Sequence, residues 1–418
     1  MRMNKKKEIV PKLRFPEFIG DKLKITKLGK ISSVVKEKAG ENKYTLMSVT
    51  SGVGLIPQTE KFGREIAGDS YKNYIVIRKY DFAYNKSATK QFPEGYISML
   101  GEYDIAAVPN SIFTCFRITG NESYPPFFDY LWHNNYHGHW LRKYIEVGAR
   151  AHGALSVDTK HLWSMPLALP DFKEQQKIAD CLSSIDELID AESRKLKALE
   201  KYKKGLMQKL FPAEGKTLPE WRFPEFQGCG EWKSKSIGKA CKMFSGGTPD
   251  TSKKEFYGGT IPFIRSAEIN KSSTELFITE EGFKNSSAKM VKKGDILIAL
   301  YGANSGEVAL SKIDGAINQA ILCLRHETNN VFVYHYFTHM KNWIISRYIQ
   351  GGQGNLSGQI IKSVNLYFPK AEEQQKIADF LSEIDTMITG QSNKVEQLKA
   401  HKKGLMQGLF PSFEEADV

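Results

Sequence analysis

Two long stretches of the chain carry apolar side chains at steps that alternate between three and four residues. This spacing forms the narrow seam along which helices pack in a coiled coil. Neither stretch contains proline, and Pro170 and Pro212 flank the first, where helix boundaries are expected. We therefore predict two long helices that pack against each other in antiparallel orientation. The predicted seam residues are Ile178, Leu182, Ile185, Ile189, Leu196, Leu199, Ile377, Leu381, Ile384, Ile388, Val395 and Leu398.

The two stretches are copies of one sequence. Glu174-Gln-Gln-Lys-Ile-Ala-Asp180 recurs as Glu373-Gln-Gln-Lys-Ile-Ala-Asp379, and Lys203-Lys-Gly-Leu-Met-Gln208 recurs as Lys402-Lys-Gly-Leu-Met-Gln407. The separation of the copies is much longer than the periods of about 20–50 residues found in solenoid proteins. The chain is therefore predicted to be a duplicated unit with a pseudo-two-fold internal repeat. Polar gaps in the seam are repeated as well: Glu192 and Gln391, then Lys203 and Lys402.

Short strand-like runs, separated by Gly and Pro, fill the regions outside the predicted helices. They include Leu46–Val49, Tyr74–Ile77, Asp81–Tyr84 and Ser111–Ile118 in the first region, and Thr260–Ile264, Asp295–Leu300, Glu307–Leu310 and Ala320–Leu324 in the second. The predicted fold class is α+β, with two similar, strand-rich domains separated by two long helices that form an antiparallel coiled coil. Because the segments between the matching runs have diverged, we expect two sites of one kind that read different ligands.

The predicted order of parts follows from the repeat. It gives a basic tail at 1–12, a first domain at 13–170, a first spacer helix at 171–212, a second domain at 213–369, a second spacer helix at 370–411 and a C-terminal tail at 412–418. Arg14-Phe-Pro-Glu-Phe18 opens the first domain, and Arg222-Phe-Pro-Glu-Phe226 opens the second just after the first helix. By symmetry, the first of these elements is expected near the end of the second helix.

The chain is basic, with 59 Lys and Arg against 47 Asp and Glu and a net charge of +12. The surplus lies in the two domains, whereas the helices are close to neutral, which favours a polyanion as the ligand of the domains. The five cysteines show no metal-binding spacing and are odd in number, which indicates a reducing compartment. No signal peptide or membrane-length apolar run is present, so a cytoplasmic protein is expected.

Sequence motifs for catalysis are missing or incomplete. The chain has no phosphate-binding P-loop, and Tyr124-Pro-Pro-Phe127 lacks the Asn, Asp or Ser that opens the similar motif of amino-methyltransferases. His133 and His137, like His335 and His339, are spaced to share one helix face, but neither pair has an evident third metal ligand. We therefore expect no catalytic residues and no metal site, and assign the histidines to packing or the surface.

Several loops combine glycine with short polar side chains or lysine, which can approach DNA phosphates and reach base edges. Ordinary turn chemistry explains any single loop about as well. The candidate DNA-binding residues are Asn85, Lys86, Ser87, Lys90, Ser245, Thr248, Tyr301, Asn304, Ser305, Gln353 and Asn355.

The duplicated helix sequence resembles the conserved regions of specificity subunits in type I restriction-modification systems. Phe244-Ser-Gly-Gly-Thr-Pro-Asp250 and Gly294-Asp-Ile-Leu-Ile-Ala-Leu300 resemble one class of their target recognition domains. Tyr74–Ser87 together with Phe92-Pro-Glu-Gly-Tyr96 resembles another class. The resemblance covers residues 13–411.

The resemblance implies a non-catalytic subunit whose two domains each read half of a bipartite, asymmetric site in double-stranded DNA. The helices would set the spacer and dock two modification (methyltransferase) subunits, which bring S-adenosylmethionine for adenine methylation. Restriction (translocase and nuclease) subunits would bring ATP and Mg, so no cofactor is expected in this chain. The alternative is a non-catalytic bridging scaffold whose two basic domains bind protein or RNA.

Overall fold

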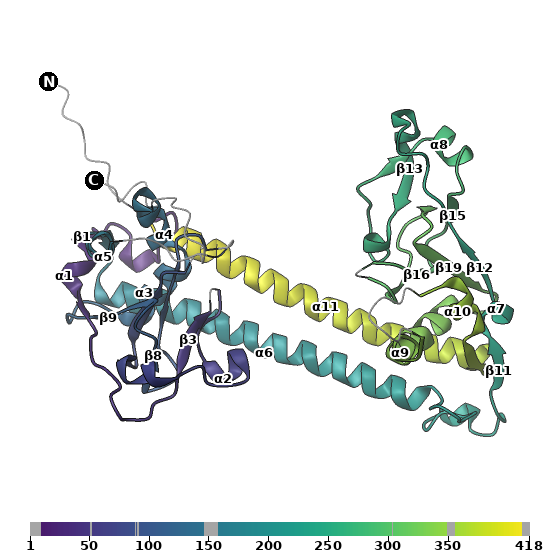
Figure 1. The fold of residues 1–418 in the computed structure, drawn as a ribbon, viewed down its shortest axis with the longest axis horizontal. Coiled ribbons are helices and arrows are strands. Elements are labelled where there is room, and N and C mark those ends of the chain that lie inside the picture. Colours follow the sequence, from purple (N-terminus) through teal and green to yellow (C-terminus); the bar gives the residue numbers. More distant parts are fainter. Residues whose placement is uncertain are drawn as a thin grey trace. The chain divides into compact units, whose positions relative to one another are not determined.

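The computed structural model describes residues 10–50, 52–87, 89, 92–145, 158–302, 304–348 and 356–411. The chain divides into two compact units, each with one globular region and a part of both long helices (Figure 1). The first unit comprises Met1–Glu192 and Lys394–Val418, and the second comprises Ser193–Asn393.

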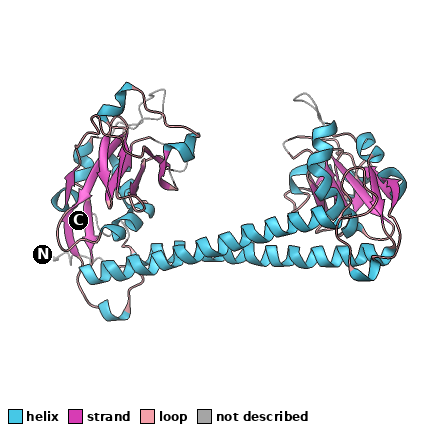
Figure 2. Cartoon of the chain, turned by 90° about the horizontal axis from the view of Figure 1, so that it is seen from below, coloured by secondary structure: helices cyan, strands magenta, loops and turns pink. Residues whose placement is uncertain are grey.

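The two predicted long helices are α6 (Phe172–Leu210) and α11 (Ala371–Leu409), each of 39 residues. Within each unit, the segment of α6 lies beside the segment of α11 (Figures 1 and 2). In the first unit, Asp186 pairs with Lys402, and Glu192, six residues further along α6, pairs with Lys394, which precedes Lys402. The helix segments are therefore antiparallel, and the predicted antiparallel coiled coil is confirmed. No helix in the described part of the chain is long and apolar enough to span a membrane.

The globular region of the first unit is built around a four-stranded antiparallel sheet with strand order β2-β9-β6-β7. Smaller pairs are formed by β1 with β10, β3 with β4, and β5 with β8. The elements are β1 (Lys24–Lys27), α1 (Leu28–Ile31), β2 (Ser32–Val34), β3 (Met47–Thr50), β4 (Gly54–Pro57), α2 (Gln58–Phe62), β5 (Ile75–Arg78), β6 (Asp81–Asn85), β7 (Tyr96–Met99), β8 (Ile105–Val108), β9 (Phe113–Ile118), α3 (Pro125–His133), α4 (Tyr136–Leu141), α5 (Thr159–Trp163) and β10 (Pro166–Leu169).

The second unit contains an equivalent four-stranded sheet of order β12-β19-β16-β17, together with a second sheet of order β14-β13-β18-β15 and the pair β11-β20. The elements are β11 (Lys233–Ser236), α7 (Ile237–Ala240), β12 (Cys241–Ser245), β13 (Tyr257–Ile264), β14 (Phe277–Ile278), α8 (Glu280–Lys284), β15 (Lys289–Val291), β16 (Ile296–Ala299), β17 (Val308–Leu310), β18 (Gly315–Ile317), β19 (Ile321–His326), α9 (Asn330–Tyr348), α10 (Gly358–Ser363) and β20 (Asn365–Phe368).

The two four-stranded sheets share their register as well as their strand order. Cys115 lies opposite Ala83 in the first sheet, and Cys323 lies opposite Leu297 in the second. Both thiols are buried, and burial raises the pKa of Cys115 to about 12. These cysteines therefore pack in the core at equivalent positions of the repeat.

An ion pair between a partly exposed arginine and a buried aspartate also recurs in the two sheets. Arg117 donates two hydrogen bonds to Asp81, at 2.6 and 2.8 Å, and Arg325 makes the same bidentate contact with Asp295, the shortest at 2.6 Å. Both aspartates are buried, so each needs its arginine to offset the loss of hydration. In each sheet the pair joins the start of one central strand to its neighbour and so fixes their register.

The ends of the long helices belong to the globular cores. In the first unit, the aromatic side chains of α3 pack with Ile178 and Leu182 of α6 and with Leu409 of α11. In the second, Ile377 and Leu381 of α11 join the equivalent core. Of the predicted seam residues, Ile178, Leu182, Ile377, Leu381, Ile384 and Val395 are buried, and Ile185, Ile189, Leu196, Leu199, Ile388 and Leu398 are half-buried.

The Arg-Phe-Pro elements attach each globular region to the long helices. The Leu13 N–H donates to the Gly408 carbonyl oxygen (2.9 Å), so the first element lies at the end of the second long helix, as predicted. Arg14 then makes a bidentate pair with the buried Glu174 of α6. Arg222 makes the same pair with the buried Glu373 of α11. Each globular region is thereby anchored to the first turn of one long helix.

Candidate nucleic-acid interface

In the first unit, the loops of the central sheet gather at one end of its strands, which we call the loop edge. Asn85, the last residue of β6, lies opposite both Phe113, the first residue of β9, and Tyr96, the first residue of β7. The loop after β6 and the loop before β9 therefore emerge side by side. Polar side chains on these loops can form one contact surface.

The second unit gathers its loops in the same way. Ser245 at the end of β12 lies opposite Leu322, and Ala299 at the end of β16 lies opposite Ile321. The loops after β12 and after β16 and the loop before β19 consequently lie at one edge. This edge brings together five of the predicted DNA-binding residues, which are Ser245, Thr248, Tyr301, Asn304 and Ser305.

Some candidate side chains in these loops are used by the loops themselves. Asn85 is buried, and its Oδ1 accepts a hydrogen bond from the Ser87 backbone N–H (2.9 Å). The Ser305 hydroxyl donates to the Leu300 carbonyl oxygen (2.9 Å), and the Thr248 hydroxyl donates to Gln319 Oε1 (2.6 Å), although Thr248, like Tyr301, is exposed. Turn chemistry therefore accounts for part of the pattern. Lys86 is half-buried at the same edge, and the predicted Lys90, Gln353 and Asn355 lie outside the described residues.

The glycines of the loop after β12 serve packing. A Cβ on Gly246 would lie 1.7 Å from the Ile317 carbonyl oxygen, and one on Gly247 would lie 2.6 Å from the Ser287 Cβ. Both contacts are closer than side chains tolerate, so only glycine allows the loop to lie against these residues. This close packing fixes the position of the loop backbone that carries Ser245 and Thr248.

A cavity of about 630 Å³ opens at the loop edge of the first unit, and it contains a lysine that the sequence analysis did not single out. Lys61 of α2 is exposed as a residue, but it lines this cavity, and partial desolvation lowers the pKa of its ammonium group. Its Nζ lies 3.3 Å from Ser48 Oγ, 3.4 Å from the Val49 carbonyl oxygen and 5.2 Å from the centre of the Phe62 ring. The hydroxyl oxygen of Thr50 is buried without a hydrogen-bond partner in the same wall.

None of the described residues that line this cavity carries a carboxylate. Phe113 and Ile112 supply apolar walls, and Asn85 and Ser87 extend the polar rim. An ammonium group in a cavity whose described lining residues carry no carboxylate binds electron-rich oxygen or nitrogen atoms, such as those of phosphates and of guanine edges. Lys61 was missed because it lies on a short helix between strands, without a motif around it.

A family model described as the type I restriction modification DNA specificity domain matches residues 70–201 and 230–400, which is more than half of the chain. The chain belongs to this family. The first match covers the later part of the first globular region, from residue 70, and the second covers most of the second region; each runs into one long helix, α6 or α11, so the model detects the same duplication that the sequence shows.

Curated members of the specificity family match the chain in part. The type I restriction enzyme MjaIX specificity subunit of Methanocaldococcus jannaschii is 31% identical over 195 residues, which are 44% of this chain and 45% of that protein. The EcoR124I/EcoR124II specificity subunit of Escherichia coli is 29% identical over 38% of this chain and 42% of that protein. The chain thus aligns with less than half the length of either relative.

Solved structures extend the likeness in fold to nearly the whole chain. The type I restriction-modification S subunit from M. genitalium superposes with a TM-score of 0.60 at 16% identity, covering 97% of this chain and all of that one. A chain from a study of assembly and conformational transition of the type I R-M system gives a TM-score of 0.58 at 16% identity, covering 93% and 98%. The α+β fold with two similar domains and long helices is therefore the fold of this family.

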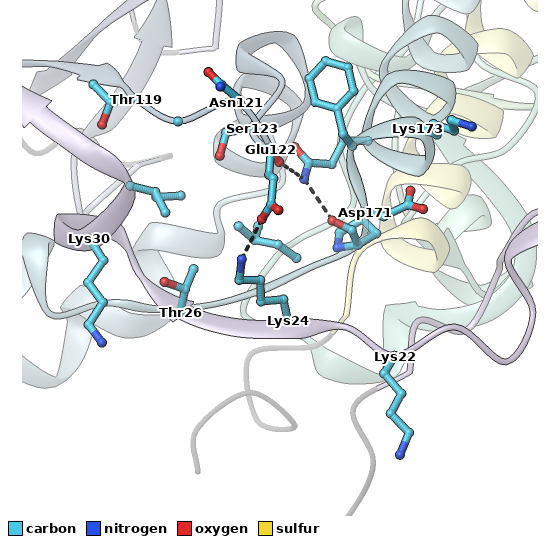
Figure 3. Close-up of a pocket in the computed structure, with 16 residues that line it drawn as sticks. Lys22, Lys24, Thr26, Lys30, Thr119, Asn121, Glu122, Ser123, Asp171 and Lys173 are labelled. Carbon is cyan, nitrogen blue, oxygen red and sulfur yellow. Dashed lines mark hydrogen bonds and ion pairs between the residues drawn. The ribbon is translucent and has the colours of Figure 1, made fainter.

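A second cavity of the first unit, about 710 Å³, lies at the opposite edge of the sheet, near the start of α6 (Figure 3). Lys24 reaches Glu122 across it (2.6 Å), and Gln175 donates to the carbonyl oxygens of Glu122 and Pro170. Lys30 extends away from these groups (Figure 3). These polar groups thus pair with one another. The cavity lies where the globular region meets α6, and its charged side chains do not converge on one point.

The histidine pairs lie partly in the cores. His137 is fully buried with its Nε2 3.2 Å from the Gly95 carbonyl oxygen, and burial lowers the pKa of its imidazole to about 4. Burial lowers the pKa of His335 to about 3. Both imidazoles are therefore neutral at physiological pH. No group of three or more possible metal ligands occurs among the residues that the structure describes.

Proposed function

We propose that the chain is the DNA specificity subunit of a type I restriction-modification complex, and that each globular region reads one half of a bipartite, asymmetric DNA site. The observation that carries this proposal is the pair of equivalent sheets whose loops meet at one edge in each unit but differ in sequence. A common framework with unlike loops suits two readers of one ligand class that recognise different bases. The positive charge of the domains favours DNA as that ligand.

The long helices would set the spacer between the half-sites and dock two modification subunits. Leu188 of α6 and Met387 of α11 occupy the same position of the repeat, and their side chains are 43% and 56% exposed. A single exposed apolar side chain is common on protein surfaces, but the two copies of the helix expose one at the same position. Their repetition supports two docking positions of the same kind.

In this proposal the chain itself has no catalytic role. The modification subunits bind S-adenosylmethionine and methylate adenine, and the restriction subunits use ATP and Mg. The specificity subunit supplies the sequence preference of the assembly. The alternative, a bridging scaffold that binds protein or RNA, makes a different prediction for DNA binding.

Binding to duplex DNA is expected to weaken steeply as salt is raised, because lysines and arginines of the chain displace counterions from phosphates. The measurement is fluorescence anisotropy with a labelled duplex at several salt concentrations, with RNA of the same length as competitor. Salt-insensitive binding would favour the protein scaffold, and preferential competition by RNA would favour an RNA-binding role.

Lys61→Met is expected to weaken binding to a duplex that carries the first half-site, since it removes the ammonium group while keeping most of the side-chain volume. If the lysine contacts a base, discrimination at one position should fall by about 1–3 kcal/mol; if it contacts a phosphate, the salt slope should decrease by about one. Lys30→Met is the matched control, because Lys30 lines the cavity at the opposite edge. Equal effects of the two substitutions would contradict a DNA-contacting role for Lys61.

A further inference from the structure

A three-residue contact joins both long helices to the globular region of the first unit. Lys402 of α11 donates to both carboxylate oxygens of Asp186 in α6, at 2.6 Å each. The Tyr130 hydroxyl of α3 donates to Asp186 Oδ2 (2.9 Å), and the Lys402 ammonium group lies 5.0 Å from the centre of the Tyr130 ring. The side chains of Lys402 and Asp186 are only 19% and 40% exposed, so this bridge is partly withdrawn from water.

The second unit repeats the bridge with the helices exchanged. Lys203 of α6 donates to Asp385 Oδ1 of α11 (2.5 Å), and the two side chains are 13% and 36% exposed. Nδ1 of the buried His335, from α9, lies 3.9 Å from Asp385 Oδ2. In both units, therefore, a helix of the globular region lies next to the bridge between the long helices.

The bridges join identical positions of the duplicated sequence. Asp186 corresponds to Asp385, and Lys203 corresponds to Lys402. Each lysine occupies one of the two repeated polar gaps in the apolar seam. Both bridges therefore define one and the same antiparallel alignment of α6 and α11, although each is formed inside a different unit.

The apolar seam by itself leaves the alignment underdetermined, because its pattern recurs every seven residues and a slip of one heptad pairs apolar residues again. Such a slip would bring Ala179 or Ser193 to the place of Asp186 beside Lys402. The half-buried ammonium group would then lose its carboxylate partner, and the same would happen to Lys203 in the second unit. Polar groups inside a seam are known to select one register at some cost in stability.

We propose that Asp186–Lys402 and Lys203–Asp385 are positioning pairs that select a single register of the long helices, and thereby a single spacer length between the two DNA half-sites. The inference rests on the proposed function. Tyr130 adds a second effect, since its hydrogen bond to Asp186 ties the globular region of the first unit to the register of the helices. Helix length alone fixes a range of spacings, and the bridges select one value together with the cores that pack on the ends of both helices.

The test uses the double variant Lys203→Met, Lys402→Met in the complete methyltransferase complex. Methionine fits an apolar seam, but Asp186 and Asp385 lose their lysine partners, so the variant is expected to fold with thermal stability equal to or below that of the wild type. Its methylation should nevertheless spread over several spacer lengths. The readout is sequencing of methylated adenines in a DNA library that carries the two half-sites at graded separations.

Charge exchange provides the rescue. Asp186→Lys alone places two ammonium groups together and should lose the single spacer, whereas Asp186→Lys combined with Lys402→Asp should restore it. Lys399→Asp is the matched control, because Lys399 is exposed and pairs with Glu396 of its own helix. A folded methionine variant that methylates only the wild-type spacer would overturn the inference while leaving the proposed function intact. If the wild type itself showed no bipartite methylation, the proposed function would be at fault instead.

Discussion

Replacing residues 221–369 by the equivalent domain of a relative should change one half of the methylated DNA motif and leave the other half unchanged. The replaced segment contains the whole loop edge of the second unit, from Ser245 to the loop before β19. The first unit keeps its own edge and its own core, which includes residues of α6 and α11 outside the exchanged segment. The measurement is the methylated motif of cells that carry the chimaera with its modification subunits.

The exchanged domain must still pack on the retained helix ends. Met207, Leu210 and Phe211 of the first helix copy contribute to the core of the second unit, and the closing Leu-Phe-Pro is repeated in the second copy. A relative with the same closing sequence is therefore the donor of choice. The reciprocal exchange of residues 13–170 is the control and should alter only the other half. A chimaera with both halves changed would contradict independent reading by the two domains.

Lengthening both long helices by four residues should lengthen the spacer while leaving both half-sites unchanged. The insertions are placed after Ala198 in α6 and after Thr389 in α11, which lie opposite each other between the two bridges. Four residues add about 6 Å of helix and slightly more than one turn, so the seam stays nearly in phase. Since base pairs are stacked about 3.4 Å apart, the preferred spacer should grow by one or two base pairs. Methylation of a library with graded spacers measures the shift.

Insertion of two residues at the same places is the matched control. It rotates each helix by about 200° beyond the insertion, so the seam residues turn away from their partners. This variant should fail to assemble with the modification subunits, as measured by gel filtration. If the four-residue variant assembled and kept the original spacer, a feature other than the helices would set the distance between the half-sites.

The long helices were predictable because their information is local and periodic. The alternation of three- and four-residue steps gave α6 and α11 to within a few residues, and the repeat indicated that each helix has a partner of equal length. Most of the predicted strand runs were found for a similar reason, since they are short apolar segments bounded by turn residues. Both signals depend only on neighbours in the sequence.

Contacts between residues distant in sequence could not be predicted in this way. Asp81 and Asp295 look like exposed strand ends in the sequence, yet each is buried against an arginine at least 30 residues further along. Lys203 and Lys402 were visible only as gaps in the seam, and nothing nearby identified Asp385 and Asp186 as their partners. Partner choice depends on strand order and helix alignment, which the fold determines as a whole.

The candidate interface shows the same division between local and long-range information. The glycine-rich sequence from Ser245 to Thr248 correctly indicated a loop, but the role of its glycines became apparent only from their contacts with Ile317 and Ser287. Lys61 had no sequence signal because its cavity is assembled from β3, β6, β9 and α2. The base contacts of each candidate residue remain predictions.

In the proposed function, the two units read the two halves of one DNA site. The most direct measurement is single-molecule sequencing of modified adenines in a host that expresses this chain with its modification subunits, compared with the same host lacking only this chain. We expect a methylated motif of two unlike half-sites separated by a spacer of fixed length, present only when the chain is expressed. A continuous methylated motif, or a methylation pattern that does not change when the chain is removed, would contradict it.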